Sequence, residues 1–156
     1  MKRPQNRRPF VTIWTSILSV FFLSACAAIE SVDESLNYVN DATGYIQQVS
    51  EAGTELQQMA QDAVNNADIT AQFKDKLEQL QTKANEFKQI HPPAIAETIH
   101  EKLLSYNDQL ITAVTNFNES LAAQGFSLEN WQRTGIPDLI ANINNLKQQL
   151  GELGGG

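Results

Sequence analysis

The chain has 156 residues, 42% of them hydrophobic and 19% charged, which is a globular composition with room for one domain. Its formal net charge is −7, and the part after residue 25 holds 18 acidic against seven basic residues, which excludes nucleic acid as a main partner. The single cysteine, Cys26, excludes an intramolecular disulfide and every multi-cysteine metal site.

The N-terminus has the parts of an export signal. Residues 1–9 include four basic residues and no acidic one, and residues 10–23 form an apolar stretch. A helix of that length spans about 21 Å, which is shorter than the hydrocarbon core of a bilayer, about 30 Å thick. The pattern therefore predicts a signal peptide over residues 1–25, with its basic end on the cytoplasmic side, rather than a permanent spanning helix.

The end of this signal, Leu23-Ser24-Ala25-Cys26, resembles the lipobox of bacterial lipoproteins at all four positions. In such proteins diacylglycerol is joined to the cysteine sulfur and a peptidase cuts before the cysteine. The resemblance therefore implies a mature chain 26–156 that is anchored to the membrane through Cys26. The acidic mature chain would be repelled by an anionic membrane surface, so the lipid has to supply the attachment. The alternative, an ordinary buried cysteine after a chance small residue, fits the signal less well.

The basic segment leaves two export routes open. Arg7-Arg8-Pro9-Phe10 is similar to part of a twin-arginine motif. Asn6 stands where that motif usually has Ser or Thr, which favours an ordinary basic segment of the general secretory route. By either route, we expect the mature chain on the outer face of the cell membrane.

The mature chain has helical periodicity throughout, because apolar residues recur every three or four positions among good helix formers. A first helix is expected to end near Gly53, where Thr54-Glu55-Leu56-Gln57 fits a capping box that would restart a second helix. That second helix stops around Asn65-Asn66, and Asp68 can cap a third. The apolar positions of the first two helices are Ile29, Val32, Leu36, Val39, Ile46 and Val49, then Leu56, Met59, Ala60, Ala63 and Val64.

Proline and glycine divide the rest of the chain. His91-Pro92-Pro93 has to end the third helix, and Pro93 suits the first turn of a fourth helix that ends at Gly125. A looser stretch follows, and Pro137 opens a last helix. The expected core positions are Ile69, Phe73, Leu77, Leu80, Ala84, Phe87 and Ile90, then Ile95, Ala96, Ile99, Leu103, Tyr106, Leu110, Val114, Phe117 and Leu121, then Leu139, Ile140, Ile143, Leu146 and Leu150.

Each apolar stripe covers one side of its helix, so the helices must bury the stripes against one another. Short connections favour antiparallel neighbours. The predicted fold is all-α: an up-and-down antiparallel bundle of about four main helices plus a short C-terminal helix, preceded by a signal-peptide helix. Residues 26–156 form its single domain. At the Pro92-Pro93 turn we expect Phe87 and Ile90 to meet Ile95 and Ile99, and at the far end Phe73 and Leu77 to meet Phe117 and Leu121.

Two segments of the mature chain resemble a family of small lipoproteins from Bacillus-type Gram-positive bacteria. They are Ser35-Leu36-Asn37-Tyr38-Val39-Asn40-Asp41-Ala42-Thr43, and Pro92-Pro93 followed by Ile95-Ala96-Glu97 and the Ile99-His100 pair. The resemblance implies an all-helical, membrane-tethered protein on the outer side of a single membrane, and it carries over no activity and no catalytic residues. The chain departs from the family pattern near Gly53, where a proline is expected.

The residue patterns do not indicate catalysis or a cofactor. Glu97-Thr98-Ile99-His100 is the Glu-x-x-His element of di-iron bundles, but a second one is missing because Lys88 stands three residues before His91. His100 is expected at the boundary of a solvated helix face, with Glu97 and Glu101 pointing outward. We therefore expect no catalytic, cofactor-binding or metal-ligating residue, and a protein that is not an enzyme.

Tyr38, Tyr45 and Trp131 are the candidate binding residues. Tyr38 and Tyr45 are seven residues apart and share one edge of the first helix, whereas Trp131 lies in the looser stretch. Two interpretations are open: ordinary packing with the hydroxyls reaching solvent, or a patch for a protein partner. The function predicted first is a non-enzymatic interaction module for another envelope protein. The alternatives are a bundle that binds a small apolar or cationic molecule, and a structural spacer.

Overall fold

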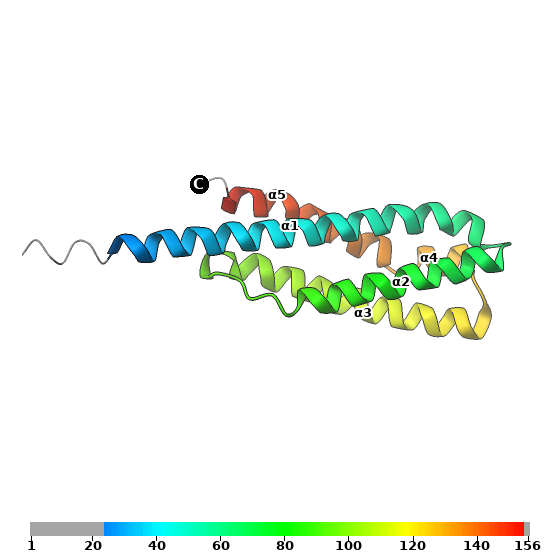
Figure 1. Cartoon of the computed structure of the whole chain (residues 1–156). Coiled ribbons are helices and arrows are strands. Elements are labelled where there is room, and N and C mark those ends of the chain that lie inside the picture. The colour runs from blue at the N-terminus through cyan, green and yellow to red at the C-terminus, as the bar shows by residue number, and fades with distance from the viewer. Residues whose placement is uncertain (1–23, 155–156) are drawn as a thin grey trace, which may run out of the picture. The chain divides into compact units, whose positions relative to one another are not determined.

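The computed structural model describes the backbone of residues 24–154 and the side chains of residues 33–153. The predicted signal peptide lies outside this part, apart from Ser24 and Ala25. The helices are α1 (Ser24–Ala63), α2 (Ala67–Phe87), the 3-10 helix η1 (Ala94–Ala96), α3 (Glu97–Gln124), α4 (Leu128–Gln132) and α5 (Ile136–Gly154). Figure 1 labels the α-helices. No strand occurs between residues 24 and 154, and the predicted all-α class is confirmed. Over the same residues, no helix combines the length and the apolar character needed to cross a membrane.

The chain divides into two units after Asp33. In the first unit, α1 is helical from Ser24 onward. The second unit runs from Glu34 to the C-terminus and holds the rest of α1 together with all the other helices. Every contact described below lies within this second unit.

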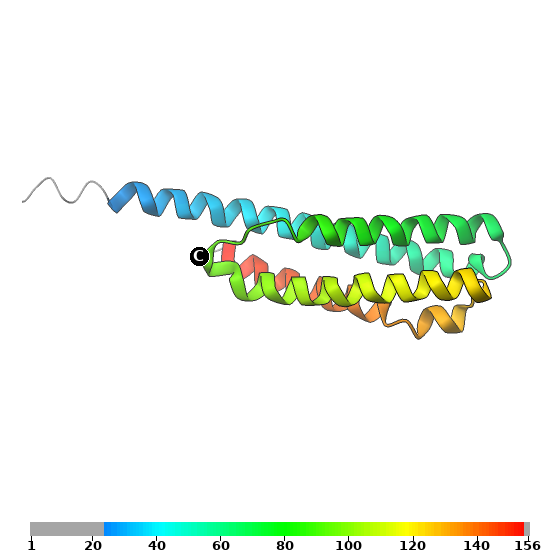
Figure 2. The same cartoon turned by 90° about the horizontal axis from the view of Figure 1, so that it is seen from below.

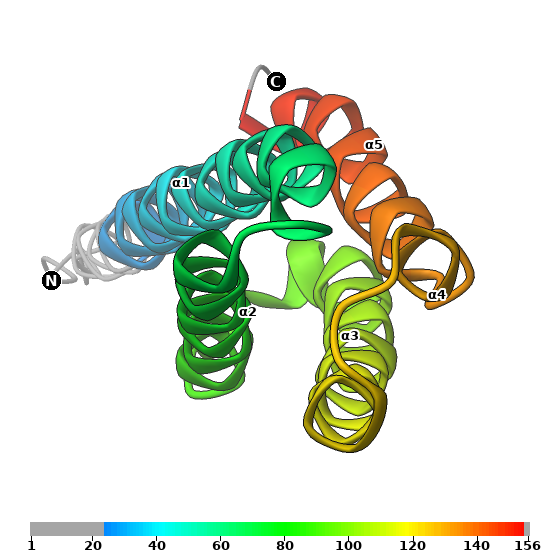
Figure 3. The same cartoon turned by 90° about the vertical axis from the view of Figure 1, so that its right-hand side faces the viewer.

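Four long helices of the second unit form an up-and-down bundle. Consecutive long helices run in opposite directions (Figure 2), and seen end-on α1, α2, α3 and α5 surround one core (Figure 3). Consequently α1 and α3 are parallel and face each other across the core. The predicted bundle is confirmed, but its helices are assigned differently. The first two predicted helices are one helix, α1, while the C-terminal helix α5 is one of the four long ones and the short helix is α4.

The helix end predicted at Gly53 is wrong, because α1 continues through this residue. Thr54 does not cap a new helix, since its Oγ1 donates to the carbonyl oxygen of Ser50 one turn earlier, at 3.1 Å. Gly53 serves packing instead. A Cβ built on it would lie only 2.7 Å from Cγ2 of Ile140 on α5. The missing side chain therefore permits a close approach of α1 and α5 rather than a break.

The other helix ends follow local chemistry, with two corrections. The cap of α2 is Asn66 and not Asp68, because the Asn66 side chain accepts hydrogen bonds from the N–H groups of Asp68 and Ile69 at 3.0 and 3.2 Å. Pro93 precedes η1 rather than standing in the first turn of α3. The predicted helix end at Gly125 is confirmed, and its φ of 77° favours glycine, although its ψ of 180° lies outside the left-handed helical region. Pro137 does lie in the first turn of α5.

The core follows most of the predicted stripes, and α2 buries Phe73, Leu77, Leu80, Ala84 and Phe87 as expected. The predicted distal contact is present, because the ring centroids of Phe73 and Phe117 are 6.1 Å apart. The predicted contact of Ile95 with Phe87 is wrong, since Ile95 is 61% exposed. It lies in η1, whose tighter winding of about three residues per turn moves it off the stripe of α3. Leu36 and Val64, also predicted in the core, are exposed.

Candidate functional site

Of the two interpretations open for Tyr38, Tyr45 and Trp131, the fold excludes an exposed patch for a protein partner and favours packing, because it buries all three residues. Their exposed fractions are 3%, 6% and 1%. The Trp131 ring packs against Phe73 and Phe117, with centroids 4.9 and 5.7 Å away, and so closes the distal end of the core. The two tyrosine hydroxyls do not reach solvent either, because each has a partner inside the bundle.

Tyr38 and Tyr45 belong to two buried polar pairs that connect α1 to α3. The hydroxyl of Tyr38 lies 3.1 Å from Nδ1 of His100, and the hydroxyl of Tyr45 donates to Oδ1 of Asn107 at 2.5 Å. Both pairs join residues 62 positions apart, so they repeat with the same seven-residue step on two parallel helices. Sliding one helix by a turn would leave these groups buried without partners, so the pairs define the register of α1 against α3.

Phe87 of α2 completes this buried cluster. Its ring stacks on Tyr45 with 4.4 Å between centroids and lies 5.3 Å from the ring of His100. Burial raises the pKa of Tyr38 to about 12 and that of Tyr45 further still. Burial also lowers the pKa of His100 below its ordinary value, and so does the nearby His91, although Glu101 raises it. The hydroxyls of the cluster therefore stay protonated and the imidazole stays neutral near pH 7.

The structure corrects the position predicted for His100, which is 5% exposed and belongs to the core rather than to a boundary face. Glu97 and Glu101 are exposed as expected, so the Glu-x-x-His element does not gather its ligands at one place. Asn107, which sequence reasoning did not single out, is completely buried. The matching seven-residue steps from Tyr38 to Tyr45 and from His100 to Asn107 are the signal that could have revealed both pairs.

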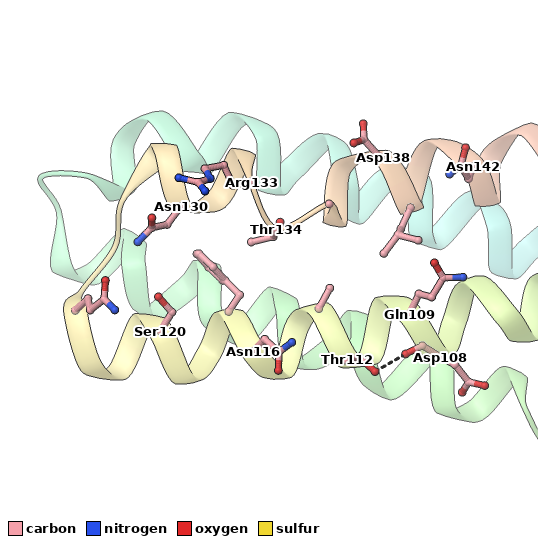
Figure 4. A pocket seen from close by; sticks show the side chains of 15 residues that line it. Asp108, Gln109, Thr112, Asn116, Ser120, Asn130, Arg133, Thr134, Asp138 and Asn142 are labelled. Carbon is pink, nitrogen blue, oxygen red and sulfur yellow. Dashed lines mark hydrogen bonds between the residues drawn. The ribbon is translucent and has the colours of Figure 1, made fainter.

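A groove of about 950 Å³ lies on the surface between α3, α4 and α5, as Figure 4 shows. Its walls carry amide and hydroxyl side chains, and apolar atoms of Ala113, Phe117 and Leu139 lie between them. The polar walls include Gln109, Thr112, Asn116 and Ser120 on one side and Asn130, Thr134 and Asn142 on the other.

Three charged side chains line the groove, and two of them, those of Asp108 and Arg133, form ion pairs, whereas that of Asp138 forms none with another described residue. Asp108 forms an ion pair with Lys88 at 2.5 Å, and Arg133 lies 3.7 Å from Glu129. The side-chain amides of Asn116 and Asn142 form no hydrogen bond with another residue of the described part. The groove therefore offers apolar surface, neutral hydrogen-bonding groups and the carboxylate of Asp138.

Two predicted features concern metals and lipid. Within the described residues, no three His, Cys, Asp or Glu are grouped so that they could hold a metal ion. Cys26, the predicted lipid-attachment residue, lies near the start of α1, and its side chain lies outside the described ones.

These features define a small all-helical bundle whose core holds the Tyr38–His100 and Tyr45–Asn107 pairs and whose surface carries a groove with a mixed apolar and polar lining. The chain belongs to DUF6376, a family of unknown function, which matches residues 38–153 and thus includes both pairs and the groove. It is similar to the uncharacterized lipoprotein YybP of Bacillus subtilis (strain 168), with 27% identity over 143 residues, 90% of this chain and 95% of that protein. The predicted resemblance to an uncharacterised lipoprotein family is confirmed. No solved structure matches the chain.

Proposed function

We propose that the protein is a lipoprotein on the outer face of the cell membrane, attached through diacylglycerol on Cys26. Two observations support the proposal: the lipobox match of Leu23-Ser24-Ala25-Cys26, and the similarity of nearly the whole chain to a bacterial lipoprotein. The lipid supplies the attachment, because each buried methylene contributes about 0.8 kcal/mol and two acyl chains hold a protein stably.

Metabolic labelling with an alkyne fatty acid tests the anchor. Cells that express the wild-type chain should yield a labelled, processed protein, whereas Cys26→Ala should yield an unlabelled, uncleaved precursor. Asn144→Ala, which changes an exposed position on α5, is the matched control and should be labelled like the wild type. A mature wild-type N-terminus other than Cys26, or label that persists in Cys26→Ala, would refute the anchor.

The helical unit acts, in this proposal, as a non-enzymatic module that binds another protein of the cell envelope through the groove between α3, α4 and α5. The observation that carries the proposal is the groove itself, with unpaired amides on its walls above a closely packed core. An amide side chain both donates and accepts hydrogen bonds, so it pairs well with uncharged polar groups on a partner. The lining has hydroxyls but no imidazole or thiol that could take part in nucleophilic catalysis, which favours binding over chemistry.

A photo-crosslinking amino acid introduced in living cells tests this function. Placed at Asn116 or Asn142 in the groove, it should capture one protein partner, which mass spectrometry then identifies. Placed at Asn85, an exposed asparagine on α2 that lies outside the groove, it should not capture that partner. Purified partner should bind the wild-type chain at least tenfold more tightly than Asn116→Ala/Asn142→Ala. If the crosslinked products are the same from all three positions, the groove is not the binding site for the partner. A crosslink to a small molecule would favour the alternative that the protein binds a small ligand.

A further inference from the structure

The described part of the chain contains two histidines in opposite surroundings. His91 is exposed in the loop between α2 and η1, whereas His100 is 5% exposed in the core. The imidazole of His100 contacts the ring of Tyr38 edge-on, with 5.7 Å between centroids, and lies tilted against Phe87 at 5.3 Å. Three helices thus meet at this one titratable ring.

The hydrogen bond at this ring depends on the protonation state of His100. The hydroxyl of Tyr38 lies 3.1 Å from Nδ1 of His100, and the direction of this bond follows the tautomer: Nδ1 accepts when the imidazole proton is on Nε2 and donates when the proton is on Nδ1. Once both ring nitrogens carry a proton, Nδ1 can only donate, so the bond in which the hydroxyl donates is lost. The hydroxyl can rotate and accept instead, but the positive charge then remains in a site without solvent.

The surroundings compensate that charge poorly. From α1 the ring meets the uncharged Tyr38, and from α2 it meets Phe87. On its own helix α3, Glu101 favours the charged form, and His91 in the preceding loop opposes it. From α5, the described residues include no charged group that shifts the pKa of His100. Burial lowers the pKa of His100 by more than Glu101 raises it, because the carboxylate of Glu101 is exposed and screened by solvent.

We propose that the Tyr38–His100 pair is an acid-sensitive joint, at which protonation of His100 loosens the contact between α1 and α3. The second pair, Tyr45–Asn107, has no group that titrates in the same range, because burial raises the pKa of Tyr45. Acid therefore weakens the contact between Tyr38 and His100, while the hydrogen bond between Tyr45 and Asn107, seven residues further along both helices, is retained. This inference concerns the folded unit itself and is independent of the anchor and of the groove.

The sign of the effect follows from linkage. The pKa of His100 in the folded state is lower than its ordinary, unfolded-state value of 6.5. The contribution of the neutral Tyr38–His100 pair to the free energy of unfolding is thus present above about pH 6.5 and is lost as the pH falls below that value. One proton can raise the unfolding equilibrium constant by at most about tenfold per pH unit.

The test uses the full chain in detergent micelles, with urea unfolding measured at several pH values between 5 and 8. Relative to His100→Gln, the wild type should show an additional rise of its unfolding constant as the pH falls below 6.5, by less than tenfold per unit. His91→Gln removes the exposed histidine that opposes the charged form of His100, so it should keep the additional rise of the unfolding constant in acid but make it smaller than in the wild type. Because all three proteins carry the same carboxylates, the comparison cancels the acid titration of those groups.

Nuclear magnetic resonance of the wild-type imidazoles gives a second readout that does not require the variant to fold. The pKa of the His100 ring should lie below 6.5, the ordinary value for histidine. Hydrogen exchange, corrected for intrinsic rates, should become faster around residues 38 and 100 in acid before it does so around 45 and 107. Equal pH dependence of wild type and His100→Gln, or a His100 pKa at or above 6.5, would overturn the proposal.

Discussion

Gly44 and Gly53 lie nine residues apart in α1, and the same substitution at each should have opposite effects. Both have ordinary helical backbone angles, so alanine should gain about 0.5–1 kcal/mol of helix stability at either site. A Cβ on Gly44 would meet no atom within 4 Å, so Gly44→Ala should stabilise the protein by that amount.

At Gly53 the gain is opposed by overpacking. The new Cβ would lie 2.7 Å from Cγ2 and 3.2 Å from Cδ1 of Ile140. Ile140 is only 7% exposed, so its branched side chain has little room to turn away. Overpacking in a core costs about 1–3 kcal/mol, so Gly53→Ala should destabilise the bundle by up to about 2 kcal/mol. The two alanine variants should differ by about 1–3 kcal/mol.

Thermal unfolding of the full chain, followed by circular dichroism, measures this difference, since 1 kcal/mol corresponds to roughly 4 °C for a unit of this size. In an Ile140→Ala background the clash is absent, and Gly53→Ala should become stabilising, like Gly44→Ala. A double-mutant cycle isolates this coupling between the two residues. The reasoning is refuted if Gly53→Ala raises the melting temperature of the otherwise wild-type chain as much as Gly44→Ala does.

Two further substitutions test the core. Phe117→Ala removes a ring that packs on Phe73, Phe126 and Trp131, and should cost about 3–5 kcal/mol in urea unfolding, whereas Glu119→Ala on the exposed face of the same helix should have little effect. Tyr45→Phe removes the donor to buried Asn107, whose Nδ2 already has no partner in the described part, and should cost about 1–3 kcal/mol. Adding Asn107→Leu should recover part of that loss. Equal losses for Phe117→Ala and Glu119→Ala, or no recovery in the double variant, would contradict the packing described.

The sequence by itself determined the helical class, most helix limits and most of the core, because these depend on neighbours along the chain. A helix repeats every 3.6 residues, so the stripe of α2 from Phe73 to Phe87 can be read without knowing what it packs against. Gly125 and Pro137 act on the backbone next to them, and their effects were predicted for the same reason. The relation to a lipoprotein family also follows from short local motifs.

Only the tertiary structure decided the role of residues whose meaning depends on a distant partner. Gly53 looks like a helix end until Ile140 of α5 is placed beside it. Tyr38 and Tyr45 look equally suited to a surface until His100 and Asn107, 62 positions away, supply partners for their hydroxyls. Periodicity tells which side of a helix is apolar, but not which polar residues at the edge of that stripe become buried. That outcome is set by how closely and in what register the helices pack, because a buried polar group is tolerated only where another helix brings its hydrogen-bond partner.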